Sequence, residues 1–223
     1  GYFSNLLMFY HPAEDRFTRF YPDDFSFRTI CENDNGELFI GTSKLSLFNP
    51  ATGKTTIIWE SPENAHFYDL LLTEDGILWG GMGNSLLLRY NSLNEKKDLF
   101  RISPELYHIE DICADEDGSI WLALLGGGLC NFNPETGKAV SYTTSNGLAN
   151  NTTYSILKDS GGNLWISTDN GISRFNPGTG QFRSFSQADG LKISEFNSDA
   201  SFVSHDGEFF FGGMGGFVSF NPD

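Results

Sequence analysis

Residues 146–185 read NGLANNTTYSILKDSGGNLWISTDNGISRFNPGTGQFRSF, and this stretch decides the fold. An alternating apolar segment leads to a D-S-G-G turn, and a segment centred on Trp165 leads to a D-N-G turn. A third segment ends in Phe-Asn-Pro, and a G-T-G turn leads to a fourth. Gly in such turns accepts positive φ and favours tight hairpins. The stretch therefore predicts four short antiparallel strands.

The same unit recurs along the chain at a constant period. The turn glycines Gly36, Gly76, Gly118, Gly162 and Gly207 are 40, 42, 44 and 45 residues apart. The Asn-Pro-like pairs that begin at positions 49, 91, 133, 176 and 221 keep steps of 42, 42, 43 and 45. Four strands repeated at this spacing are typical of β-propeller blades. We expect an all-β propeller of four-stranded antiparallel blades, about five in this chain.

The turn glycines and the Asn-Pro-like pairs divide residues 1–223, which form a single propeller segment, into blades. Residues 5–21 form a half blade with strands at 6–10 and 17–21; residues 25–60, 65–102, 107–144 and 152–186 form complete blades; residues 197–221 form a three-stranded last blade. The chain could close as a five-bladed ring or belong to a seven-bladed one. Because the strand at 6–10 is surplus to a five-bladed closure, we expect part of a larger ring. Apolar faces at its ends would favour homo-oligomers.

The unit NGL, SILKDSGGNLWISTDNGISRFNP and a following G-x-F turn resembles the regulator-propeller repeats of hybrid two-component sensors of the Bacteroides type. The resemblance is strongest at residues 146–185 and weakest at 61–102, and FFFGGMGGFVSFNPD is similar to the last blade of such a propeller. It implies a non-catalytic, periplasmic sensor, probing carbohydrates and signalling by phosphorelay to a downstream histidine kinase. It also implies the rest of the parent sensor, another propeller and a β-sandwich domain, as partners.

Composition excludes several classes of function. The net charge of −15 argues against nucleic acid or direct contact with an anionic membrane, which need clustered Lys and Arg. No H-x-x-x-H or H-E-x-x-H spacing occurs, so we expect no metal and no cofactor. Cys31, Cys113 and Cys130 form no C-x-x-C pair and are interpreted as small buried residues. Asp115 to Gly118 is interpreted as a hairpin turn rather than a calcium loop.

A candidate ligand site follows from comparing equivalent repeat positions. The first strand of each blade lines the central channel, so polar residues where these strands begin should meet at the channel mouth. That set is Arg28, His66, Tyr68, His108, Glu110, Tyr154, Asn197 and Asp199. Such side chains hydrogen-bond sugar hydroxyls and stack on sugar faces, which predicts an oligosaccharide ligand. The alternative is that any propeller mouth is polar because it is wet.

Evidence for an enzyme is thin. Propeller lyases that open cyclic streptogramin antibiotics have similar D-G-x-x-W repeats, which leaves a catalytic propeller as one alternative and a purely structural or interaction propeller as another. His108 and Glu110 are the only local pair of a histidine and an acid, and two residues apart on a strand they would share a face. We expect no catalytic residues and no enzymatic activity from this chain.

Overall fold

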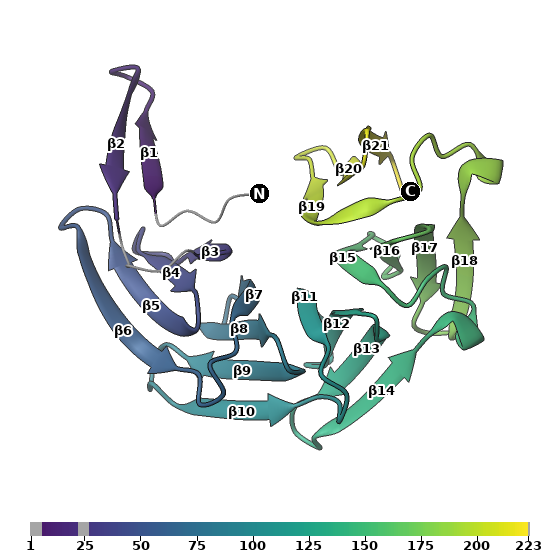
Figure 1. The fold of residues 1–223 in the computed structure, drawn as a ribbon, viewed down its shortest axis with the longest axis horizontal. Coiled ribbons are helices and arrows are strands. Elements are labelled where there is room, and N and C mark those ends of the chain that lie inside the picture. The colour runs from purple at the N-terminus through teal and green to yellow at the C-terminus, as the bar shows by residue number, and fades with distance from the viewer. Residues whose placement is uncertain (1–5, 22–26, 223) are drawn as a thin grey trace.

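The computed structural model describes residues 6–21 and 27–222, and all of its regular elements except two single 3-10 turns are β-strands. The strands form successive antiparallel sheets arranged as an open arc (Figure 1). The prediction of an all-β, propeller-like fold built from four-stranded antiparallel sheets is confirmed.

Six sheets follow one another along the chain. A hairpin is formed by β1 (Leu7–His11) and β2 (Arg16–Phe20). Four sheets of four strands follow: β3 (Thr29–Glu32), β4 (Leu38–Gly41), β5 (Lys44–Asn49), β6 (Lys54–Glu60); β7 (Phe67–Leu72), β8 (Ile77–Met82), β9 (Leu86–Asn91), β10 (Lys97–Arg101); β11 (His108–Ala114), β12 (Ile120–Leu125), β13 (Gly128–Asn133), β14 (Lys138–Tyr142); and β15 (Thr153–Lys158), β16 (Leu164–Thr168), β17 (Gly171–Asn176), β18 (Gln181–Phe185). The last sheet has three strands, β19 (Phe196–Val203), β20 (Phe209–Gly213) and β21 (Gly216–Phe220). The first strand of each sheet lies on the inner side of the arc and the fourth on the outer side (Figure 1).

The core lies between the sheets. Its buried residues form four clusters, and each joins two consecutive sheets. In the cluster between the third and fourth four-stranded sheets, Phe175 is fully buried and its ring centroid lies 5.5 Å from that of Trp121 and 4.8 Å from that of Tyr142. Trp79, Trp121 and Trp165 are all buried in this way. The aromatic residue repeated in the second strand is therefore a packing residue.

The turn between the second and third strands brings neighbouring sheets close together. Gly171 has φ +95°, and a Cβ atom there would lie 2.2 Å from the carbonyl oxygen of Phe185. The Gly171 amide donates to the carbonyl of Ser194, at the entrance to the next sheet, over 2.7 Å. Glycine is needed because any side chain would collide with the backbone of the adjacent strand.

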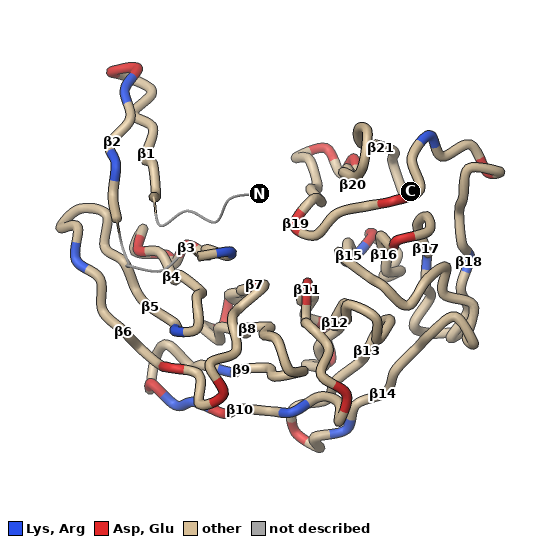
Figure 2. Tube along the Cα trace, viewed as in Figure 1, with Lys and Arg blue, Asp and Glu red and all other residues tan. Residues whose placement is uncertain are grey.

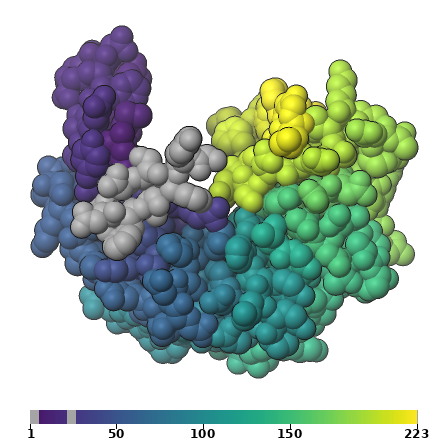
Figure 3. Space-filling view, viewed as in Figure 1, coloured from purple at the N-terminus to yellow at the C-terminus, as the bar shows by residue number. Residues whose placement is uncertain are grey.

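The arc is not closed by any pairing among the described residues. Strand β2 pairs with β1 and packs Phe20 against Phe48 at 5.3 Å, while β21 pairs only with β20. The hairpin and the last sheet stand on either side of the open part of the arc (Figure 3). The five-bladed closure is therefore not adopted here. The blade number of the intact ring and the oligomeric state stay predictions.

Both ends of the arc expose apolar side chains. Phe202 and Phe217 of the last sheet are 64% and 66% exposed, and Phe17 of the hairpin is 60% exposed. In the interior of the arc the equivalent surfaces are covered by the next sheet. The first two residues of the blade expected at 25–60 lie outside the described residues. The strand expected at 17–21 is observed one residue earlier, as β2.

Phe175→Ala should lower the free energy of unfolding by about 3–5 kcal/mol, because it opens a cavity in an inter-sheet cluster. Phe217→Ala is a matched control, since it removes the same side chain from a third strand at an exposed position; its cost should stay within about 0.5 kcal/mol. Urea unfolding followed by tryptophan fluorescence measures both. Equal effects of the two substitutions would contradict the inter-sheet core.

Candidate functional site

The inner strands carry the eight residues predicted at the channel mouth. Arg28 directly precedes β3, His66 directly precedes β7, Tyr68 lies in β7, His108 and Glu110 lie in β11, Tyr154 lies in β15, and Asn197 and Asp199 lie in β19. Along the inner side of the arc, acidic residues lie on β11 and β19 and a basic residue lies beside β3 (Figure 2). Six of the eight interact with one another.

Three of these side chains stack across three successive sheets. The Arg28 guanidinium carbon lies 4.3 Å from the centroid of the Tyr68 ring. The Tyr68 and His108 rings stack with centroids 4.4 Å apart, and the Tyr68 hydroxyl lies 3.4 Å from His108 Nε2. A cation over an aromatic face is stabilised by the ring quadrupole. The stack therefore fixes the positions of all three side chains.

Glu110 lies beside this stack and is only 5% exposed. Its Oε1 lies 3.7 Å from His108 Nδ1. The pairing of β11 with β12 shifts register between Ile109 and Asp111, so Glu110 is the extra residue of a β-bulge. Bulges re-aim a side chain out of the regular alternation. Burial raises the pKa of Tyr68, and the negative charge of Glu110 adds to this against the opposing charge of Arg28.

Tyr154 and Asp199 complete the set from the next two sheets. The Tyr154 hydroxyl donates to Asp169 Oδ1 over 3.3 Å, and burial followed by the charges of Asp169 and Glu110 raises the Tyr154 pKa. Asp199 is exposed as a residue, but partial burial of its carboxyl and the charge of Glu110 raise its pKa, while Arg28 opposes the rise. Its φ of +56° is a left-handed conformation that few residues other than glycine adopt. We call Arg28, Tyr68, His108, Glu110, Tyr154 and Asp199 the inner-rim cluster.

The prediction placed two further residues at the mouth, and the structure does not join them to the cluster. His66 and Asn197 are exposed, and their side chains make no hydrogen bond or ion pair with the cluster among the residues that the structure describes. The register shifts between Phe67 and Asp69, and between Phe196 and Ser201, so simple alternation does not decide which of these side chains meet.

Sequence reasoning missed two aspartates directly below the cluster, Asp69 and Asp111. Asp69 Oδ2 accepts from the Ile112 amide over 3.0 Å, and Asp111 Oδ2 accepts from the Ile156 amide over 2.6 Å. Each carboxyl thus links one inner strand to the next. The signal was available, because residues seven before the turn glycine read Thr29, Asp69, Asp111, Ser155 and Ala200. Only two of the five are acidic, which hid the pattern.

The two carboxyls lie against each other. Both Asp69 and Asp111 accept from the same amide, that of Ile112, over 3.0 and 2.8 Å. Burial raises the pKa of Asp69 to about 6. Burial, and then the charge of Asp69, raises the pKa of Asp111 well above its usual range. Two carboxyls in such contact cannot both ionise at low cost, so the pair holds a proton.

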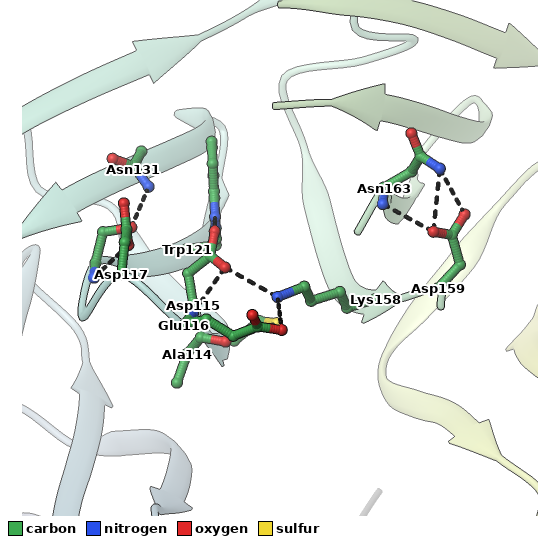
Figure 4. Close-up of polar contacts among 11 residues, drawn as sticks. Ala114, Asp115, Glu116, Asp117, Trp121, Asn131, Lys158, Asp159 and Asn163 are labelled. Carbon is green, nitrogen blue, oxygen red and sulfur yellow. Dashed lines mark hydrogen bonds and ion pairs between the residues drawn. The ribbon is translucent and has the colours of Figure 1, made fainter. Parts of the chain in front are cut away.

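The opposite face of the arc carries the Asp-Gly turns and Asn-Pro corners, and we call it the turn face. Asp115 accepts from the Trp121 indole and from Lys158 of the next sheet, each over 2.9 Å (Figure 4). Burial would raise the pKa of Asp115, but these two hydrogen bonds lower it below its usual value. A polar pocket of about 800 Å³ lies between these sheets, lined by Asp115, Lys158 and Asp159 among others. The aspartates that line this pocket already accept hydrogen bonds from neighbouring residues, so we assign them to stabilising the turns.

The described residues form no metal-binding site and no reactive-thiol site. No group of three or more His, Cys, Asp or Glu side chains there is placed to hold a metal ion. Cys130 is buried, whereas Cys31 and Cys113 are only half-buried, and all three are free. Burial raises the pKa of Cys113 to about 12 and that of Cys130 to about 11, which keeps these thiols protonated.

The sheets and their inner rim define a protein of the β-propeller class. Residues 147–170 match the family described as "Two component regulator propeller". Over 78 residues the chain is 34% identical to histidine kinase P4 of Formosa agariphila, covering 35% of this chain and 6% of the kinase. The resemblance to regulator-propeller repeats of two-component sensors is thereby confirmed.

Solved structures share the fold at low identity. The extracellular domain of a one-component system of B. thetaiotaomicron is 22% identical with a TM-score of 0.65, over 97% of this chain and 31% of that domain. The extracellular domain of a hybrid two-component system of B. thetaiotaomicron is 15% identical with a TM-score of 0.53, over 97% of this chain and 44% of that domain. Inactive virginiamycin B lyase from Staphylococcus aureus, solved with quinupristin, is 18% identical with a TM-score of 0.71, over 98% and 74%. The described residues contain no helix long and apolar enough to span a membrane.

The Asp69–Asp111 pair predicts that stability falls as pH rises. Between about pH 4 and 6 an unfolded aspartate loses its proton while the folded pair keeps one, so the folded state binds more protons. Unfolding free energy should drop by about 1–2 kcal/mol over this window, and Asp111 should extend the fall above it.

Asp111→Asn mimics the protonated form and should flatten this slope. Asp34→Asn, at an exposed turn position, should leave the slope unchanged. Urea unfolding at several pH values measures it. A wild-type stability that rises between pH 5 and 8 would contradict the shared proton.

Proposed function

We propose that this chain is the ligand-sensing part of an extracytoplasmic, periplasmic propeller in a hybrid two-component sensor. The observation that carries the proposal is the inner-rim cluster, to which five successive sheets each contribute. Hydrogen-bonding and aromatic groups that converge from separate elements are the usual composition of a small-ligand site. The regulator-propeller repeat and the sensor-domain folds support the assignment to a sensor.

The proposed ligand is a glycan fragment. The face of Tyr154 suits stacking on a sugar ring, and the carboxyls of Glu110 and Asp199 accept hydrogen bonds from sugar hydroxyls. A ligand that bridges several sheets would favour one spacing of the inner strands over another. The ligand can shift the equilibrium between the two arrangements only by the difference in its affinity for them. The rest of the parent sensor, including its histidine kinase, would receive this change.

A lyase-type propeller is the second candidate, because of one observation. His108 Nδ1 and Glu110 Oε1 lie 3.7 Å apart on an inner strand, and the fold resembles that of virginiamycin B lyase. A histidine with an adjacent acid can act as a general acid or base. The same two groups are accounted for by the stack and the bulge, so sensing is favoured over catalysis.

Tyr68→Ala should weaken oligosaccharide binding about tenfold or more, or about 1.4 kcal/mol or more, because it removes the ring that holds Arg28 and His108 in place. Tyr21→Ala, at a 65% exposed position, is the control and should bind like the wild type. Calorimetric titration against a panel of neutral and charged oligosaccharides measures this.

Two results would contradict sensing at the inner-rim cluster. One is binding that is insensitive to Tyr68→Ala. The other is turnover of a cyclic streptogramin that His108→Ala abolishes, which would establish the lyase candidate instead.

A further inference from the structure

An apolar pocket of about 420 Å³ lies between the sheet β15–β18 and the last sheet, beside the outer edge of β21. Its walls come from β16, β17, β18, the turn after β18 and β21, and they include Trp165, Ile172, Phe185, Leu191, Val218 and Phe220. Within the described part of the chain the last sheet has three strands, whereas each of the four sheets before it has four. The pocket therefore lies where a fourth strand of the last sheet would pack.

The preceding interface shows which side chains fill the equivalent space. There Phe182 of the fourth strand β18 packs on Phe175 and Tyr142, with ring centroids 4.4 and 6.2 Å apart. Phe182 also lies over Gly147, because a Cβ atom added to this glycine would lie 3.3 Å from Phe182 Cβ. Two residues later, the Ser184 hydroxyl donates to the Gly147 carbonyl over 3.1 Å. One aromatic and one polar side chain of the fourth strand thus occupy this space.

The turn that receives Phe182 recurs at the pocket. Residues 143–148 and 186–191 both form a 3-10 turn with a capping box and a left-handed glycine, Gly147 at φ +107° and Gly190 at φ +99°. Apart from the chain neighbours, no described atom lies within 4 Å of a Cβ atom added to Gly190. The receiving half of the interface is therefore repeated at the last sheet without the aromatic side chain that fills it.

Strand β2 carries the residue pattern that the pocket lacks. RFTRF at 16–20 corresponds to QFRSF at 181–185, and in both hairpins the strand begins four residues after a proline. The residue before each strand has a positive φ, 46° before β2 and 70° before β18. Phe17 therefore corresponds to Phe182, and Phe17 is 60% exposed. The chain thus contains both a pocket for a phenylalanine and an exposed phenylalanine on a matching strand.

A second copy can supply this strand without a change in the arc. The hairpin and the last sheet of one chain stand on either side of its open part (Figure 3). Bringing them together would change the packing between sheets, which densely packed interfaces resist. In a second copy the hairpin packs Phe20 against Phe48 of the next sheet. That sheet would follow β2 onto the last sheet of the first copy and cover its exposed Phe202 and Phe217.

The exchange requires β2 to leave β1, because β1 and β21 both take the third position of a sheet. An isolated two-stranded hairpin is at best marginally stable in water. Met8 and Phe9 of β1 are 54% and 51% exposed, which shows how little β1 is packed. Strand β21 instead belongs to a sheet in which Phe209 and Phe211 are buried. Pairing with β21 would therefore give β2 a larger sheet and bury Phe17.

We propose that the last sheet of one copy binds β2 of a second copy as its fourth strand, with Phe17 in the apolar pocket. The pairing of β17 with β18 gives the register, which places Phe220 opposite Phe17 and Val218 opposite Arg19. Different surfaces of the two copies meet, so a copy that donates its β2 keeps its own pocket open. The chain is therefore expected to assemble head to tail.

The test is light scattering of the whole chain over a wide range of protein concentration, at about 0.15 M salt to screen charge repulsion. We expect a mean mass above that of one chain, which rises with concentration. Phe17→Ala should weaken the association about tenfold or more, because it removes the side chain that fills the pocket. Val218→Arg, which places a second cation opposite Arg19, should act in the same direction. Leu93→Ala, at an 82% exposed position on the turn face, is the control and should change nothing.

A synthetic peptide of residues 14–21, EDRFTRFY, supplies the strand without the rest of the donor. It should lower the mean mass by competition and change the tryptophan fluorescence, because Trp165 lines the pocket. The peptide with Phe17→Ala should do neither.

Three results would overturn the inference. The first is the mass of one chain at every concentration. The second is an association that neither Phe17→Ala nor Val218→Arg weakens. The third is a monomer whose tryptophan fluorescence responds to Phe17→Ala, which would mean that the chain's own hairpin fills the pocket.

Discussion

The structure depends on side-chain packing between sheets. Within each sheet the strands are joined by continuous antiparallel hydrogen bonding, but consecutive sheets meet mainly through apolar side chains. At one such interface the aromatic residue of a second strand, Trp121, and the last residue of a fourth strand, Tyr142, enclose Phe175 of the following sheet. Each aromatic side chain buried in this way contributes on the order of 1.5–3 kcal/mol. Repetition of the same contact sets the direction of every sheet relative to the last, and so makes the arc.

The inner rim is a consequence of this arrangement. Packing aligns the first strands of the sheets, and bulges in β7, β11 and β15 turn one residue of each strand out of the regular alternation. Side chains from sheets some 40 residues apart in sequence therefore meet, as in the stack of Tyr68 on His108. The carboxyls of Asp69 and Asp111 hold adjacent inner strands together through backbone amides, at the cost of keeping a proton between them. Rigid packing outside and polar convergence inside are what a ligand site on a scaffold requires.

Repetition made most of the fold predictable. The turn glycines and the aromatic residue three positions later are local signals with clear physical causes, and Trp165 is buried where its register requires. The inner-rim cluster was predicted only in part. Comparison of repeat positions placed His66 with Tyr68 and Asn197 with Asp199, but the register irregularities of β7 and β19 leave no mark in the sequence. Asp69 and Asp111 were missed because their role is a contact between sheets, which a comparison of single repeats does not show. Whether the propeller ring closes, and with how many blades, could likewise not be predicted from the sequence, because two exposed ends are consistent with rings of several sizes.

A crystal structure of the chain with a bound oligosaccharide would test the account most directly. The account places the sugar at the inner rim, with its hydroxyls against Glu110 or Asp199 and a ring face against Tyr154. An oligosaccharide bound instead on the turn face, in the pocket beside Asp115 and Lys158, would contradict it.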